Sequence, residues 1–188
     1  MAKSNTSHRW VETGYGLFAK EGPEGIQVER LARIIGLNKS GFYHYFGDGD
    51  SFTEQLLKRH NTIAEEIIAD LKNASQLDPD LFTILLSYKP AILFHMQLVR
   101  NRHIEVYLHC YYSLNALLDP YIIRLFSEYV GLQNNQQLAS SYFDQARDMF
   151  YARVTDKNMN EKFLRSLLKE VKHLAQEFLG QQSAFDRN

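Results

Sequence analysis

Residues 26–46, IQVERLARIIGLNKSGFYHYF, contain two short helical patterns separated by a turn at Gly36. The first pattern covers about 28–34 and has its apolar residues on one side. The second covers about 38–45 and begins at Asn38, a residue that favours the N-cap position. Two short helices joined by such a turn predict a helix-turn-helix, whose second helix enters the major groove of DNA.

The second helix of this motif has one apolar and one polar side. Phe42 and Phe46 are four residues apart and predict a buried stripe. Lysine, serine, tyrosine and histidine side chains on the other side can hydrogen-bond phosphates or base edges. Arginines on the preceding helix can contact flanking phosphates, and Glu29 is the one acidic residue among them. The residues that this pattern assigns to DNA are Arg30, Arg33, Lys39, Ser40, Tyr43 and His44, with Gly41 between them.

Helical periodicity extends over almost the whole chain, whereas alternation with a period of two is scarce, so the predicted fold class is all-α. Gly14 and Gly16 weaken the first predicted helix, and glycine there can permit close contact between helices. A kink or break is expected at Pro90, and Asp119-Pro120 is a typical helix start. The predicted helices are 8–20, 28–34, 38–45, 50–72, 80–100, 102–118, 120–131, 133–153 and 159–179.

Residues 10–52 resemble the N-terminal domain of the TetR family of transcriptional regulators. The resemblance rests on Leu17-Phe18, Lys20-Glu21-Gly22, Gly25, Leu31-Ala32 and the whole of 36–46. It implies phosphate contacts for Tyr43 and Tyr45, and base or backbone contacts for Lys39, Ser40, Gly41 and His44. The remaining positions that it adds to the predicted DNA-binding set are Gln27 and Asn38.

Two positions depart from the family pattern. Gln27 stands where a threonine is frequent, so a hydroxyl cap is lost. Gly49, between Asp48 and Asp50, stands where a lysine is frequent, which removes one phosphate contact and adds repulsion. We therefore expect the DNA contacts of this chain to differ in part from those of the family.

The C-terminal helices predict a dimer interface. The 159–179 helix has two adjacent apolar rows, a face wider than one neighbouring helix needs, and 133–153 has a similar pattern. The resemblance implies that the last two helices of each subunit form a four-helix dimer interface. The same apolar rows can also pack within a monomer. The predicted interface residues are Phe143, Phe150, Phe163, Leu164, Leu167, Leu168, Val171, Leu174 and Phe178.

Residues 80–130 are rich in aromatic and imidazole side chains. The resemblance implies an effector pocket among these helices, and an apolar cavity with a few polar groups suits a small apolar or aromatic molecule. Aromatic stripes are also usual in helical cores, so the same residues fit a core without a cavity. The predicted pocket residues are Tyr88, Phe94, His95, His103, Tyr107, Tyr111, Phe126, Tyr129 and Phe143.

Composition and motifs argue against a disulfide-bonded, metal-binding, enzymatic or membrane-spanning protein. Cys110 is the single cysteine, which excludes an internal disulfide and multi-cysteine zinc sites, and fits a reducing cytoplasm. His103 and His109 are six residues apart and point to different sides of a helix, so no metal and no cofactor are expected. The sequence contains no phosphate-binding glycine loop and no nucleophile elbow, so no motif in it indicates an enzyme. The apolar stretch 81–99 contains Lys89 and Pro90 and predicts a core helix, not a membrane span.

The predicted organisation is a DNA-binding domain at 1–49 and a helical effector-binding and dimerisation domain at 50–188. The expected function is repression by a homodimer on a near-palindromic double-stranded operator, relieved by an effector. The helix at 50–72 would connect the two activities. The alternative is an adapter of the same fold that binds DNA and a protein partner, without a small-molecule effector.

Overall fold

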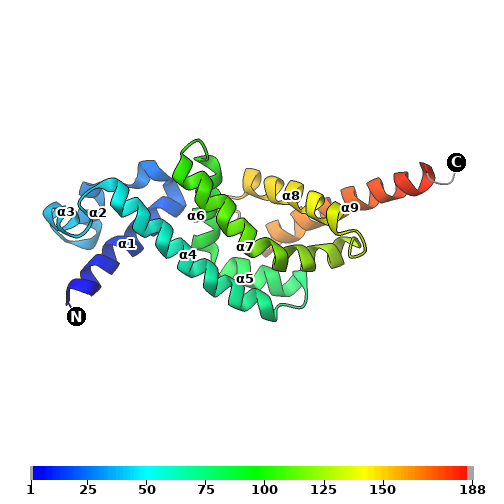
Figure 1. Ribbon diagram of the computed structural model, residues 1–188, viewed down its shortest axis with the longest axis horizontal. Coiled ribbons are helices and arrows are strands. Elements are labelled where there is room, and N and C mark those ends of the chain that lie inside the picture. Colours follow the sequence, from blue (N-terminus) through cyan, green and yellow to red (C-terminus); the bar gives the residue numbers. More distant parts are fainter. Residues whose placement is uncertain (1, 186–188) are drawn as a thin grey trace. The chain divides into compact units, whose positions relative to one another are not determined.

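The computed structural model describes the backbone of residues 2–185 and the side chains of residues 6–177. Within that part of the chain the structure is helical and contains no strand, as the sequence predicts (Figure 1). The elements are α1 (Ala2–Glu21), η1 (Pro23–Gly25), α2 (Val28–Ile35), α3 (Lys39–Phe46), α4 (Gly49–Asn73), η2 (Leu77–Leu81), α5 (Phe82–Ser87), α6 (Lys89–Arg100), α7 (Glu105–Val130), α8 (Gln136–Arg153) and α9 (Glu161–Phe185).

The chain forms two compact units. The first contains residues 1–67 and 88–115, and the second contains 68–87 and 116–188. The first unit therefore contains more of the chain than residues 1–49. That residues 1–49 form the DNA-binding domain stays a prediction.

The first unit has an aromatic core built around α1. Phe18 and Tyr15 of α1 lie against Phe94 of α6, with ring centroids 4.2 and 4.4 Å apart. Gly14, which directly precedes Tyr15, faces Phe52 of α4, and a Cβ atom at this glycine would lie 2.5 Å from the Phe52 ring. The expectation of close helix contact is therefore confirmed at this glycine. It is wrong at Gly16, where a Cβ atom would meet nothing within 4 Å.

The second unit is held by aromatic packing and ion pairs. Phe126 of α7 packs against Phe143 of α8 with ring centroids 5.5 Å apart. Arg147 of α8 donates two hydrogen bonds of 2.8 Å to the carboxylate of Asp119 on α7. Arg165 of α9 pairs with Asp78 of η2. These contacts join helices that are far apart in the sequence.

Two predicted boundaries need comment. The break near Pro90 is confirmed, because α5 ends at Ser87 and α6 begins at Lys89, with the proline in its first turn. The predicted start at Asp119-Pro120 is wrong, because α7 continues through Pro120 to Val130. The side chain of Asp119 is engaged by Arg147 and does not cap a new helix.

Candidate nucleic-acid interface

The turn between α2 and α3 fixes the helix-turn-helix. Gly36 ends α2 with φ of 69°, a left-handed conformation that favours glycine. The Leu37 N–H donates to the Ala32 carbonyl at 2.9 Å and closes the turn. Arg9 of α1 donates to the Ile35 carbonyl at 2.6 Å, so a side chain from another helix satisfies the end of α2. The turn is thereby tied to α1 as well as to its own backbone.

The α3 helix is anchored by its two phenylalanines. Phe42 is fully buried, and Phe46 is 8% exposed. The Phe42 ring meets Trp10 of α1 at 5.5 Å and Phe52 of α4 at 5.0 Å between centroids. The predicted apolar stripe is therefore the face that packs on the unit, and the remaining face of this short helix is available to a partner.

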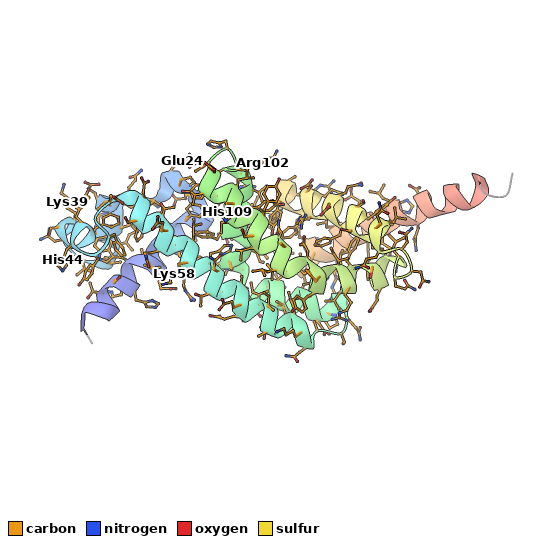
Figure 2. The ribbon with its side chains drawn as sticks, in the orientation of Figure 1. Glu24, Lys39, His44, Lys58, Arg102 and His109 are labelled. Atoms are coloured by element: carbon orange, nitrogen blue, oxygen red, sulfur yellow. The ribbon has the colours of Figure 1, made fainter. Side chains whose placement is uncertain are left out.

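The predicted DNA-binding residues lie on the accessible surface of α2, α3 and their caps. Tyr43 is 52% exposed. Figure 2 shows Lys39 and His44 projecting outward from α3. A compact row of polar side chains on a short helix has the size and chemistry that the major groove admits. The exposed members of the set are Gln27, Arg33, Asn38, Lys39, Ser40, Tyr43 and His44, and the half-buried ones are Arg30, Gly41 and Tyr45.

Two of the basic residues are already paired with carboxylates. Arg30 donates two hydrogen bonds to Glu21 of α1, at 2.5 and 2.7 Å. The Arg30 guanidinium accordingly lowers the pKa of the Glu21 carboxyl. Lys39 lies 3.5 Å from Glu29, and both side chains are largely exposed, so this pair is weak. In this structure Lys39 is thus the more available cation, and Arg30 would reach a phosphate only by leaving Glu21.

The helix caps differ in part from the sequence prediction. Asn38 occupies the N-cap position of α3, but its side chain makes no capping hydrogen bond. Asp48 caps α4, since its carboxylate accepts the Ser51 N–H at 2.8 Å. The backbone donors of this turn lower the pKa of Asp48. Asp48 therefore has a structural function beside the expected repulsion of phosphates.

Sequence reasoning missed two residues that position the interface. Arg9 lies before residues 10–52, and Trp10 is not among the residues on which the resemblance rests, yet Arg9 closes α2 and Trp10 supports α3. Trp10 carried a usable signal, because a lone tryptophan in a helix beside an aromatic stripe favours burial. The partner of Arg9 is a backbone carbonyl 26 residues away, and no local pattern reports such a contact.

The predicted effector residues fall into both units. In the first unit, Phe94, His95, Tyr107 and Tyr111 are buried in the core, and Tyr88 is half-buried. His103 is exposed and precedes α7, which begins at Glu105 and not near residue 102. In the second unit, Phe126 and Phe143 pack on each other and Tyr129 is half-buried under Lys172. Their contact with an effector stays a prediction.

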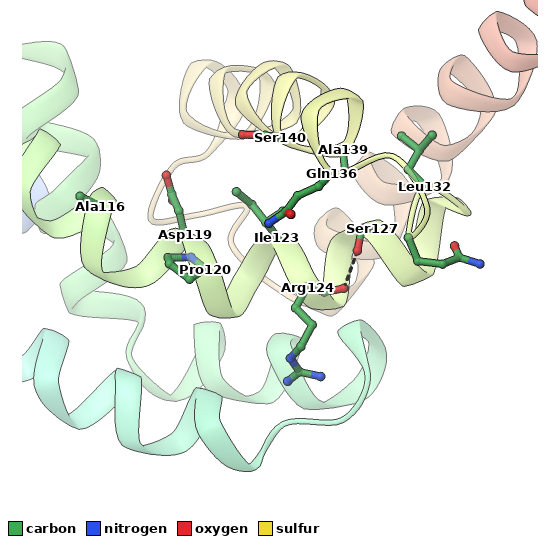
Figure 3. A pocket seen from close by; sticks show the side chains of 11 residues that line it. Ala116, Asp119, Pro120, Ile123, Arg124, Ser127, Leu132, Gln136, Ala139 and Ser140 are labelled. Carbon is green, nitrogen blue, oxygen red and sulfur yellow. Dashed lines mark hydrogen bonds between the residues drawn. The ribbon is translucent and has the colours of Figure 1, made fainter.

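A pocket of about 480 Å³ lies in the second unit between α7 and α8 (Figure 3). Its lining is mainly apolar and uncharged polar. Of its two charged residues, Asp119 is held by Arg147, and Arg124 points away from α8 to bond the Ala74 carbonyl at 2.7 Å. None of the predicted effector residues lines this pocket. Its lining residues are Ala116, Asp119, Pro120, Ile123, Arg124, Ser127, Leu132, Gln133, Gln136, Ala139 and Ser140.

The predicted dimer residues are divided between interior and surface. Phe143, Leu164, Leu167 and Val171 are buried within the chain. Leu174 is 47% exposed on α9. The half-buried members are Phe150, Phe163 and Leu168, and the Phe178 side chain lies outside the described residues. The buried row packs inside one subunit, so the accessible row is the part that a second subunit could cover.

Among the residues that the structure describes, no group of three or more His, Cys, Asp and Glu side chains is placed to hold a metal ion. In the same part of the chain, no single helix has the length and hydropathy to cross a membrane. The segments 77–87 and 89–100 meet those criteria only when they are counted together as a bent pair.

Comparison with known proteins agrees with this geometry. Residues 11–56, which contain α2, α3 and the beginning of α4, match the family of bacterial regulatory proteins, tetR family. A solved Mesorhizobium loti structure, assigned to the TetR-family transcriptional regulators, shares the fold with a TM-score of 0.56. The match covers 96% of this chain and 98% of that chain at 14% sequence identity. None of the curated proteins matches the chain.

The helix-turn-helix within the matched residues 11–56 is that of a DNA-binding transcriptional regulator. Residues 11–56 are thus similar to the tetR family of bacterial regulatory proteins.

Proposed function

We propose that this regulator is a repressor, which binds a near-palindromic operator as a homodimer and releases it when an effector binds. The observation that carries the proposal is the row of polar side chains on α3, whose apolar face is buried against α1 and α4. Lys39, Tyr43 and His44 form the exposed centre of this row. Such a helix supplies charge for phosphates and hydrogen-bonding groups for base edges.

The homodimer follows from the demands of specificity. One short helix reads few base pairs, and a genome offers a large excess of competing sites. A two-fold dimer places two such helices about 34–36 Å apart, or a multiple of that spacing, on a two-fold symmetric operator. The accessible apolar row of α9, which includes Leu174, is the surface that would support this dimer.

The effector response rests on the helices that join the two units. Both α4 and α7 contribute residues to each unit, so a molecule that binds one unit can act on the other through them. The effector must bind the DNA-competent and DNA-incompetent states with different affinity, because equal affinity shifts no population. The second-unit pocket is lined mainly by apolar and uncharged polar side chains, and its two charged residues, Asp119 and Arg124, are engaged by Arg147 and the Ala74 carbonyl, so the lining favours a small neutral molecule.

Selection from a pool of random duplex DNA, at two salt concentrations, tests the proposal. We expect a palindromic sequence to be recovered, and Lys39→Ala to weaken its binding about tenfold. Lys58→Ala is the matched control, because Lys58 is an exposed lysine of the same unit that lies on α4 (Figure 2). Recovery of no sequence by the full chain, or equal losses in both variants, would contradict the proposal.

A further inference from the structure

A chain of hydrogen bonds crosses the interior of the first unit and connects four helices. The Tyr15 hydroxyl of α1 lies 2.8 Å from Nδ1 of His60 on α4. Nε2 of His60 lies 3.1 Å from Nδ1 of His95 on α6. Nε2 of His95 lies 3.1 Å from Oδ1 of Asn115 on α7. All four residues are buried, with exposed fractions between 4% and 7%.

The far end of the hydrogen-bond chain assigns the direction of its last bond, and a neutral His95 then fixes the other two. Oδ1 of Asn115 can only accept, so Nε2 of His95 carries a hydrogen. If His95 is neutral, its Nδ1 accepts from Nε2–H of His60, and Nδ1 of His60 then accepts from the Tyr15 hydroxyl. With both imidazoles neutral, each contacting nitrogen and oxygen therefore has its complementary partner.

An added proton disrupts this arrangement. One proton on His95 requires the two bonds to His60 and Tyr15 to reverse, and it leaves a positive charge in the interior. A second proton leaves two N–H groups facing each other where the imidazoles now lie 3.1 Å apart. Burial, and to a smaller degree the adjacent His95, hold the pKa of His60 well below its usual value. Acid thus favours conformations in which the two imidazoles reach water.

The charged and titratable groups around the pair come from each neighbouring helix. Glu12 of α1 and Arg59 of α4 form an ion pair of 2.7 Å, and Glu66 of α4 lies 3.6 Å from the same arginine. On α7, the Cys110 thiol is buried, and the Tyr111 ring lies 5.2 Å from that of His95. The two carboxylates share the arginine, so the nearby acidic groups are already engaged in an ion-pair network.

The hydrogen-bond chain is linked to the DNA-reading helix through α1. Tyr15 also stacks on Phe94, with ring centroids 4.4 Å apart and an angle of 9° between the rings. Five residues earlier on the same helix, Trp10 supports Phe42 of α3. A conformation that separates Tyr15 from His60 therefore loosens the helix on which α3 rests.

We propose that the buried His60–His95 pair makes this regulator acid-sensitive: the pair holds the DNA-competent form together while it is neutral, and protons bind the opened form and lower DNA affinity. The proton is thus a second input, separate from the effector of the proposed function. The inference rests on the proposed DNA binding. A histidine that is neutral in the closed form and titrates freely in the open form raises the open population up to tenfold per pH unit below about 6.5.

The test compares the wild type with His60→Gln/His95→Gln. A glutamine can accept and donate one hydrogen bond each, as these imidazoles do, but it does not titrate. The probe is the duplex selected from the random pool at pH 7.5. Between pH 7.5 and 5.5 we expect the wild type to lose more than threefold in affinity and the double variant less than threefold. His103→Gln is the matched control, because His103 is exposed in the same unit, and it should behave as the wild type.

A second readout does not need DNA. Trp10 is the single tryptophan and is fully buried in the first unit, so its fluorescence reports the unfolding of this unit in urea. The urea midpoint should fall with acid in the wild type and less steeply in the double variant. If no duplex is selected, the proposed function fails, and this readout still tests the proton linkage.

Three results would overturn the inference. They are a wild-type affinity that does not change with pH, equal pH slopes in wild type and double variant, and an imidazolium signal from His60 at pH 6 in NMR spectra of the folded wild type. The NMR measurement needs no variant, so it decides the matter even if the glutamine substitutions prevent folding.

Discussion

The indole of Trp10 on α1 and the ring of Phe42 on α3 meet edge to face, with centroids 5.5 Å apart. Both side chains are fully buried. Aromatic pairs in this arrangement add to the free energy of burial and fix the orientation of the rings. The helix that we propose to read DNA is therefore held from its buried side by a residue of α1, so we expect the packing of α1 to affect DNA binding.

Substituting alanine for each of the two glycines of α1 should change the free energy of unfolding in opposite directions. Gly14→Ala places a methyl group 2.5 Å from the fully buried Phe52 ring, so overpacking should lower the free energy of unfolding by about 1–3 kcal/mol. The methyl group of Gly16→Ala meets nothing within 4 Å. The higher helix propensity of alanine should therefore raise the free energy of unfolding by about 0.5–1 kcal/mol.

Urea unfolding followed by Trp10 fluorescence measures both variants, and each serves as the control for the other. A stabilised Gly14→Ala protein would show that Phe52 can move aside, and the close approach of α1 and α4 would then not be a constraint on the fold.

The sequence predicted the helical class and the helix-turn-helix because both depend on local periodicity. Phe42 and Phe46 are four residues apart, and the turn needs the glycine at position 36. The continuity of α7 through Pro120 was not predictable in the same way. The local pair Asp119-Pro120 favours a helix start, but Asp119 is engaged by Arg147, 28 residues later, and only the folded unit brings them together.

The candidate nucleic-acid interface was also predictable in part. The exposed residues of α3 follow from the pattern, since whatever lies opposite the two phenylalanines faces outward. The pairing of Arg30 with Glu21 and the Tyr15–His60–His95 chain were not predicted. They join residues 9 to 45 positions apart on different helices, and no sequence period relates such positions.

The accessible row of α9 predicts the effect of a charge on self-association. Leu174→Glu places a carboxylate at a position that is 47% exposed in one subunit and that the proposed dimer would bury. Burying an unpaired charge is costly, so the dimer dissociation constant should rise at least tenfold, about 1.4 kcal/mol.

Sedimentation over a range of concentrations measures this change. Leu117→Glu on α7 is the matched control, because Leu117 is 55% exposed and is not among the predicted interface residues. Its dissociation constant should stay within twofold of the wild type. Equal effects of the two substitutions would argue against α9 as the interface.

The buried thiol of Cys110 predicts slow alkylation in the native protein. Burial raises the pKa of Cys110 to about 11, from an ordinary value of 9.0. The thiolate is the reactive form, so at pH 8 the native thiol should be about a hundredfold less reactive toward iodoacetamide than the same thiol in the unfolded chain. Mass spectrometry of the alkylated protein, with and without denaturant, gives both rates, and the single cysteine makes the assignment unambiguous. A native rate within tenfold of the unfolded rate would mean that the α7 segment of the first unit opens readily at neutral pH. In that case the Tyr15–His60–His95 chain, which ends on the same helix at Asn115, would not keep this unit closed.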